Sequence, residues 1–176
     1  MTSLLPRADA LAAAGDVSAA RALYARAARQ RVPGAHDRLC HATAVMGMGE
    51  DALACCKEAL AASPSNSFLH ALDGQEALAL GRFERAAESY ERAAAFAPAA
   101  GADLLTNLGI ALLAASRPSA AVKRLRAAVA LAPRTAAAYT ELARALEAAG
   151  STAAACDARA RVVMIDPASA SHRLDL

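Results

Sequence analysis

Aromatic residues are scarce in this sequence of 176 residues, which has no tryptophan, three phenylalanines and three tyrosines. A core built on aromatic side chains, or a platform that stacks the bases of single-stranded nucleic acid, is therefore excluded. Lysine is also rare, because 17 of the 19 basic residues are arginines, a bias typical of GC-rich bacterial genomes. The formal net charge of +2 does not indicate nucleic acid or an anionic membrane as the main partner.

Long apolar runs and cysteine pairs of the metal-binding type are also missing. The longest run without Asp, Glu, Lys or Arg, 59–72, has 14 residues, and 104–116 has 13, both fewer than the roughly 18 that a membrane-spanning helix needs. Pro6, Arg7 and Asp9 interrupt the apolar start of the chain before it could form a secretion signal. The four cysteines include no C-x-x-C pair, so we expect reduced thiols in a cytoplasmic protein without membrane insertion.

Alanine, in contrast, supplies 54 of the 176 residues. It is the strongest helix former, and seven prolines and nine glycines punctuate the chain. This composition predicts an all-α protein.

Prolines and glycines recur with a period near 34 residues. Five prolines are separated by 31, 34, 35 and 34 residues, and four glycines precede the first, second, third and fifth of them in turn. The prolines are Pro33, Pro64, Pro98, Pro133 and Pro167; the glycines are Gly15, Gly47, Gly81 and Gly150, with Ser116 in the same place of the fourth unit. Each glycine separates two segments of helical length, and each proline ends the second, which predicts helix–turn–helix units.

We expect one domain over 1–167, with units near 1–32, 33–66, 67–101, 102–135 and 136–167, and a short tail over 168–176. Small residues recur at the eighth, twentieth and twenty-seventh places, which we interpret as close helix crossings. These are Ala8, Cys40, Gly74, Gly109 and Ala143; Ala20, Ala52, Ala86, Ala121 and Ala155; and Ala27, Ala59, Ala93, Ala128 and Val162. The first helix is expected to begin at Pro6, and Pro118 to open the second helix of the fourth unit.

The pattern resembles the tetratricopeptide repeat family, in which leucine–glycine, glycine–aspartate or glycine–serine, alanine, aromatic and proline residues occupy set places. The resemblance covers about residues 1–167 and is best in 67–98 and 102–133. It implies a right-handed α-solenoid of about five repeats, or about ten antiparallel helices, whose concave groove binds segments of other proteins. The groove positions that it implies are Asp37, Arg38, His41, Phe68, Leu72, Gln75, Leu78, Thr106, Asn107, Ile110, Thr140, Glu141 and Arg144.

The sequence thus favours a non-enzymatic adaptor, scaffold or chaperone that binds a peptide or helix of a partner protein. Two alternatives stay open: a dedicated secretion-system chaperone, and a regulatory or substrate-presenting region that works with a separate enzyme such as a transferase. The clamp with which some family members hold acidic chaperone tails is not expected here, because the groove positions include one asparagine, Asn107, and no lysine.

A metal site is weakly supported. His36, Cys40 and His41 share a predicted helix, and Cys55 and Cys56 lie on the next one. Cys40 and Cys56 occupy packing positions, however, where a buried cysteine acts as a small apolar residue. We therefore expect neither a metal nor a cofactor.

Catalysis has even less support, because nucleophile-elbow, phosphate-loop and zinc-protease motifs are missing. The carboxylates of Glu84, Glu88 and Glu91 are interpreted as a solvated helix face. Near the end of the chain, the apolar surface around Val162 and Val163 has two interpretations: Arg159 and Arg161 already make the last helix soluble, or this end packs against another subunit or domain. We favour the second, a homo-oligomer formed through the C-terminal repeat.

Overall fold

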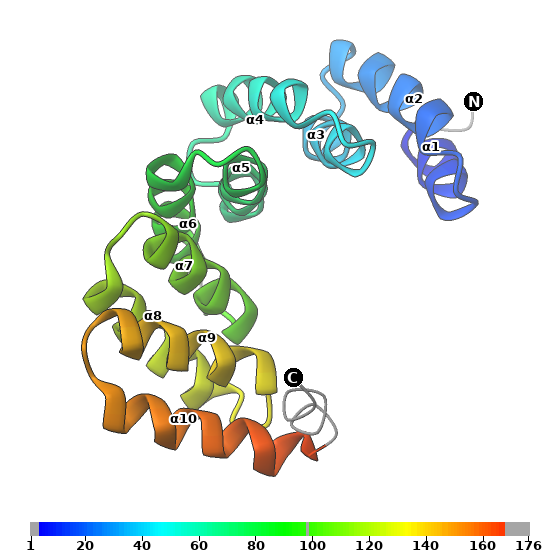
Figure 1. Ribbon diagram of the computed structural model, residues 1–176. Coiled ribbons are helices and arrows are strands. Elements are labelled where there is room, and N and C mark those ends of the chain that lie inside the picture. Colours follow the sequence, from blue (N-terminus) through cyan, green and yellow to red (C-terminus); the bar gives the residue numbers. More distant parts are fainter. Residues whose placement is uncertain (1–3, 98, 168–176) are drawn as a thin grey trace.

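The computed structural model describes residues 4–97 and 99–167, and these residues form ten α-helices and no strand. In chain order the helices are α1 Leu4–Ala13, α2 Val17–Arg29, α3 Ala35–Val45, α4 Gly49–Ala62, α5 Ser67–Ala79, α6 Phe83–Phe96, α7 Ala102–Ala114, α8 Pro118–Leu131, α9 Ala136–Ala148 and α10 Thr152–Ile165. Consecutive helices pack against each other, and the pairs stack into a curved solenoid (Figure 1). The predicted all-α solenoid is confirmed, whereas Pro98 and the tail over 168–176 lie outside the described residues.

The turn within each helix pair has one residue with positive φ, from +57° at Ser116 to +87° at Gly15. Glycine adopts this backbone conformation without the steric cost that a Cβ brings, which explains the glycine period. Pro118 is the first residue of α8, as predicted. The predicted start of the first helix is wrong by two residues, because α1 begins at Leu4. Pro6 fits its first turn, where backbone N–H groups have no partner within the helix.

The small residues of the repeat lie where helices cross. All members of the three predicted sets are buried except Val162, which is half-buried. At two crossings even alanine would be too large: a Cβ on Gly74 would lie 2.9 Å from the Tyr90 ring, and one on Gly109 would overlap the Leu125 side chain. The alanine and glycine positions therefore set the close approach of the helices.

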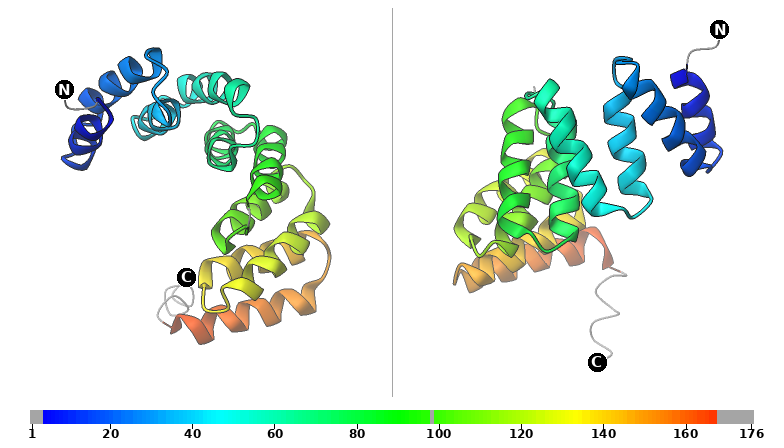
Figure 2. Two further views of the ribbon diagram at one scale, coloured as in Figure 1. Left: turned by 180° about the vertical axis from the view of Figure 1, so that it is seen from behind. Right: turned by 90° about the horizontal axis from the view of Figure 1, so that it is seen from above.

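The odd-numbered helices line the inner side of the curve and the even-numbered helices its outer side (Figures 1 and 2). Inner helices of successive pairs contact each other, α3 with α5, α5 with α7 and α7 with α9. The arrangement gives the molecule a concave face built from the first helix of each pair. Among the described residues, no helix combines the length and the apolar character required to cross a lipid bilayer.

Candidate functional site

The concave face has two adjoining hollows. The first is a cavity of about 390 Å³ between α1, α2, α3 and the start of α5, with Val17, Tyr24 and Val45 in its wall. The second, of about 270 Å³, extends from α3 across α5 to α7. His41 and Phe68 line both hollows, so these two side chains form the ridge between them.

Phe68 on this ridge is 47% exposed, although it is one of only three phenylalanines in the chain. Its ring lies 6.0 Å from the imidazole of His41, measured between centroids, and the rings are tilted by 50°. Asn66 holds the start of α5 in place, because its side-chain oxygen accepts hydrogen bonds from the backbone N–H groups of Phe68 and Leu69. The exposed aromatic ring is therefore presented by a capped helix end.

Apart from His41, whose ring contacts Phe68, the polar side chains at the first hollow already have hydrogen-bond partners. Asp9 accepts hydrogen bonds from the Tyr24 hydroxyl at 2.7 Å and from Nε of Arg38 at 3.0 Å. Asp37 accepts one from the side-chain amide of Asn66 at 2.9 Å. Burial, and then the bond to Asp9, raise the pKa of Tyr24 to about 12, so its hydroxyl stays a donor. These groups tie neighbouring repeats together, and the hollow offers a ligand mainly apolar surface.

The structure brings seven of the predicted groove residues to the two hollows. Those lining the first are Asp37, Arg38, His41 and Phe68; those lining the second are His41, Phe68, Leu72, Gln75 and Asn107. Leu72 is only 5% exposed and belongs to a core cluster with Leu69, so it mainly packs. Leu78 and Ile110 are half-buried on α5 and α7, outside both hollows.

The remaining predicted residues, on α7 and α9, make local contacts. The hydroxyls of Thr106 and Thr140 donate to carbonyl oxygens of their own helices, at 2.8 Å and 3.1 Å. Arg144 pairs with Glu141 on the same helix at 2.8 Å. The site thus concentrates on α3 and α5 rather than extending evenly along the groove.

Sequence reasoning missed Val17, Tyr24 and Leu104 as lining residues. Val17 and Tyr24 belong to α2, the outer helix of the first pair, whereas the family pattern implied groove positions on the first helix of each pair alone. The first hollow reaches α2 because α2 packs directly against α3.

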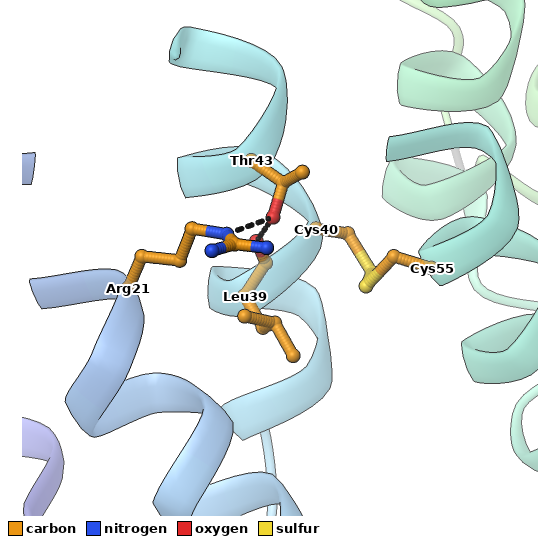
Figure 3. Close-up of a disulfide and its surroundings, with 5 residues drawn as sticks. All are labelled: Arg21, Leu39, Cys40, Thr43 and Cys55. Atoms are coloured by element: carbon orange, nitrogen blue, oxygen red, sulfur yellow. Dashed lines mark hydrogen bonds between the residues drawn. A yellow bond between two sulfur atoms is a disulfide. The ribbon is translucent and has the colours of Figure 1, made fainter. Parts of the chain in front are cut away.

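The expectation of reduced thiols is wrong for two of the four cysteines. Cys40 of α3 and Cys55 of α4 form a disulfide, with their Cα atoms 5.3 Å apart (Figure 3). Next to it, Thr43 accepts a hydrogen bond from Nε of Arg21 on α2, so covalent and polar links meet at α3 (Figure 3). Cys56 is a buried free thiol whose pKa is raised to about 12 by burial and then by nearby carboxylates. Because the thiolate is the form that binds metals and attacks electrophiles, a thiol with so high a pKa is a poor metal ligand and a poor nucleophile.

Stacked helix pairs with a concave, partly apolar groove define a helical-repeat solenoid, a class that presents extended binding surfaces. Within it, residues 106–170 match the family model described as tetratricopeptide repeat. The match covers somewhat more than a third of the chain, while the helical-repeat fold extends over all the described residues; it is the fold of a protein-interaction module, and these comparisons indicate no enzyme family.

Solved structures with the same fold include a crystal structure of MamA, with a TM-score of 0.83 and 17% identity over 96% of this chain and 92% of that one. MamA 41-end from Desulfovibrio magneticus RS-1 gives a TM-score of 0.85 and 18% identity over 93% of each chain. Likeness at these identities shows the fold alone. None of the curated proteins compared with this sequence matches it significantly.

Proposed function

We propose that this chain is a non-enzymatic adaptor that binds a segment of a partner protein in its concave groove. The observation that carries the proposal is the ridge of His41 and Phe68 between two hollows, with Phe68 47% exposed. An exposed aromatic side chain beside a concavity is the kind of surface on which binding energy concentrates.

The polar partners within the groove define the chemistry of the segment. Because Asp9 and Arg38 bond to each other, and Asp37 bonds to Asn66, a ligand charge would have to displace these links. Apolar side chains that enter the two hollows displace none of them. An amphipathic segment with bulky apolar residues on one face is therefore the proposed partner.

The site can be tested by photo-crosslinking in the native host. A photoreactive phenylalanine analogue replaces Phe68 in one version of the protein and Met164, which is 71% exposed on α10, in the control. We expect one partner segment to be crosslinked from position 68 and not from position 164. The same yield of that segment from both positions would contradict the proposal.

A peptide of the crosslinked segment then allows an affinity measurement. Phe68→Ala should weaken peptide binding by about tenfold or more in fluorescence anisotropy, whereas Met164→Ala should leave it unchanged. A Leu72→Asp change is unsuitable, because it would place a carboxylate in the core and test folding instead. Unchanged binding by Phe68→Ala would place the site elsewhere.

The cytoplasmic location stays a prediction. The Cys40–Cys55 disulfide weighs against it, because disulfides are rare in proteins of a reducing cytosol. The choice between adaptor, scaffold and chaperone depends on the partner that the crosslink identifies.

A further inference from the structure

Another hollow lies between the outer helices of the last two pairs, α8 and α10. Both helices pack against α9 (Figure 1), and among the described helices they have no comparable contact with each other. The space between them, which we call the outer hollow, has a volume of about 220 Å³ and includes none of the predicted groove residues of α9. Pockets for drug-sized ligands have roughly 300–1,000 Å³, so the outer hollow has room for a small molecule.

Helical spacing and two alanines produce the outer hollow. The residues of α10 that line it are three or four places apart, so they share one face of the helix. They are Ala154, Asp157, Ala158 and Arg161. The two alanines end at Cβ and leave the space toward α8 open. Ala154 is half-buried, so a leucine in its place would extend into the hollow.

Four polar side chains at the outer hollow have no partner. Arg126 of α8 and Arg161 of α10 bring two guanidinium groups to it, and Tyr139 and Asp157 add a hydroxyl and a carboxylate. Within 4–97 and 99–167, none of the four forms an ion pair or a side-chain hydrogen bond. Asp157 and Arg161 stay unpaired although they lie four residues apart on one helix. The groups are therefore available to a ligand, unlike the bonded Asp37 of the first hollow.

These groups define the chemistry of a ligand. Two guanidinium groups beside one small hollow favour a carboxylate, to which each can donate paired hydrogen bonds. Asp157 repels a ligand that carries a carboxylate alone, but it attracts one that also carries an ammonium group. Leu142 and Leu146 of α9, both buried at the base of the hollow, offer apolar surface to a side chain. A free α-amino acid with an apolar side chain has all three features on adjoining atoms.

We propose that the outer hollow binds a free apolar α-amino acid, whose carboxylate is held by Arg126 and Arg161 and whose ammonium group is held by Asp157. The side chain of the ligand lies on Leu142 and Leu146. A bound ligand links α8 to α10 and thereby stabilises the last two repeats, because it binds the folded chain and not the unfolded one. The inference is independent of the groove function.

Isothermal titration calorimetry of the full chain with L-leucine, L-valine and L-phenylalanine tests the ligand. We expect saturable binding of at least one of them. Two analogues of leucine each lack one charge: 4-methylpentanoate has no ammonium group, and 3-methylbutylamine has no carboxylate. Each should bind at least about tenfold more weakly than leucine, because one charged group of the site is then left without a partner.

N-acetyl-L-leucine separates a free amino acid from the end of a peptide, because it keeps the carboxylate and replaces the ammonium group by an amide. It should bind at least about tenfold more weakly than leucine. Equal binding of leucine and N-acetyl-L-leucine would mean that the site takes peptide ends and would overturn the proposal. A chain that binds none of the three amino acids overturns it as well.

Variants of the lining residues test the site itself. Arg126→Gln and Arg161→Gln should each weaken amino-acid binding by about tenfold or more, because each removes charge-assisted hydrogen bonds. Asp157→Asn should remove the preference for leucine over 4-methylpentanoate. Ala154→Leu should abolish binding, whereas Ala153→Leu, at an exposed position next to it, is the matched control and should leave binding unchanged.

Circular dichroism checks that every variant keeps the helical fold. Binding that survives Ala154→Leu in a folded chain would place the ligand outside the outer hollow. A preference for leucine that persists in Asp157→Asn would show that this carboxylate does not hold the ammonium group. Either result overturns the proposal.

Discussion

The first four helices and the last six use the same repeat but are held together differently. In α5–α10 the apolar residues form one continuous core, in which Leu108 and Leu112 of α7 are fully buried and Leu142 and Leu146 of α9 nearly so. In α1–α4 the buried apolar residues divide into smaller clusters of mostly alanine and cysteine, with partly exposed Leu39 between them. The N-terminal part therefore has less apolar burial per helix.

Specific links take the place of that burial in the N-terminal part. The disulfide joins α3 to α4, and Asp9 joins α1 to α2 and α3 through Tyr24 and Arg38. Arg21 reaches from α2 to Thr43 of α3. A repeat poor in large side chains can thus keep its geometry through a few directional contacts, which also shape the first hollow.

Core truncation should show the largest difference between the two regions. Leu112→Ala removes a fully buried side chain from the continuous core and should lower the free energy of unfolding by about 4 kcal/mol. Leu39→Ala, in a partly exposed position, should cost about half as much. Urea unfolding followed by circular dichroism measures both, with exposed Leu131→Ala as the control. Equal losses for Leu112→Ala and Leu39→Ala would remove the distinction between the regions.

Loss of the disulfide should act on the N-terminal part alone. The bridge spans a sequence separation of 15, so Cys40→Ala/Cys55→Ala should destabilise α1–α4 by about 3 kcal/mol. Hydrogen exchange should show faster exchange in α3 and α4, with α7–α10 unchanged. Cys156→Ala, at an exposed free thiol, is the matched control. A thiol titration of the unfolded, non-reduced protein should find two thiols, and a count of four would contradict the bridge.

The sequence predicted the regular part of this architecture better than its N-terminal links. Proline and glycine spacing located the turns because a positive φ and a helix end are local requirements. The disulfide and the Asp9–Tyr24 bond depend on how one helix is rotated against the next, which spacing does not specify. Phe68 was predicted as a groove residue and lines both hollows, whereas the burial of Leu72 depends on packing from α3 and α4.

Alkaline pH should weaken both regions through buried tyrosines. Burial raises the pKa of Tyr90 from its usual 10 to about 12, and the pKa of Tyr24 rises in the same way. The folded state therefore keeps protons that the unfolded state loses between pH 10 and 12, so stability falls as pH rises through that window. For Tyr90 the loss should be about 1 kcal/mol near pH 11.

Tyr90→Phe and Tyr24→Phe separate the two contributions. Each should flatten the fall of stability between pH 10 and 12, measured by urea unfolding at several pH values. Only Tyr24→Phe should also lower stability at pH 7, by about 1 kcal/mol, because it alone loses a hydrogen bond, the one to Asp9. An equal loss of stability at pH 7 for both variants would show that the Tyr24–Asp9 hydrogen bond does not stabilise the N-terminal part in the way proposed.

The smallest expected effect concerns two turns, one in each region. Ser116, between α7 and α8, and Arg31, between α2 and α3, have φ of +57° and +54°, a conformation that costs a residue with a Cβ more than it costs glycine. Ser116→Gly and Arg31→Gly should each raise the free energy of unfolding by about 0.5–1 kcal/mol, since the added freedom of the unfolded chain offsets part of the relief. Gly81→Ser, the reverse change at φ +72°, should destabilise. Equal gains in the free energy of unfolding at both positions would show that the two regions differ in helix packing and not in turn strain. A gain at Ser116 alone would show that the two regions also differ in the strain of their turns.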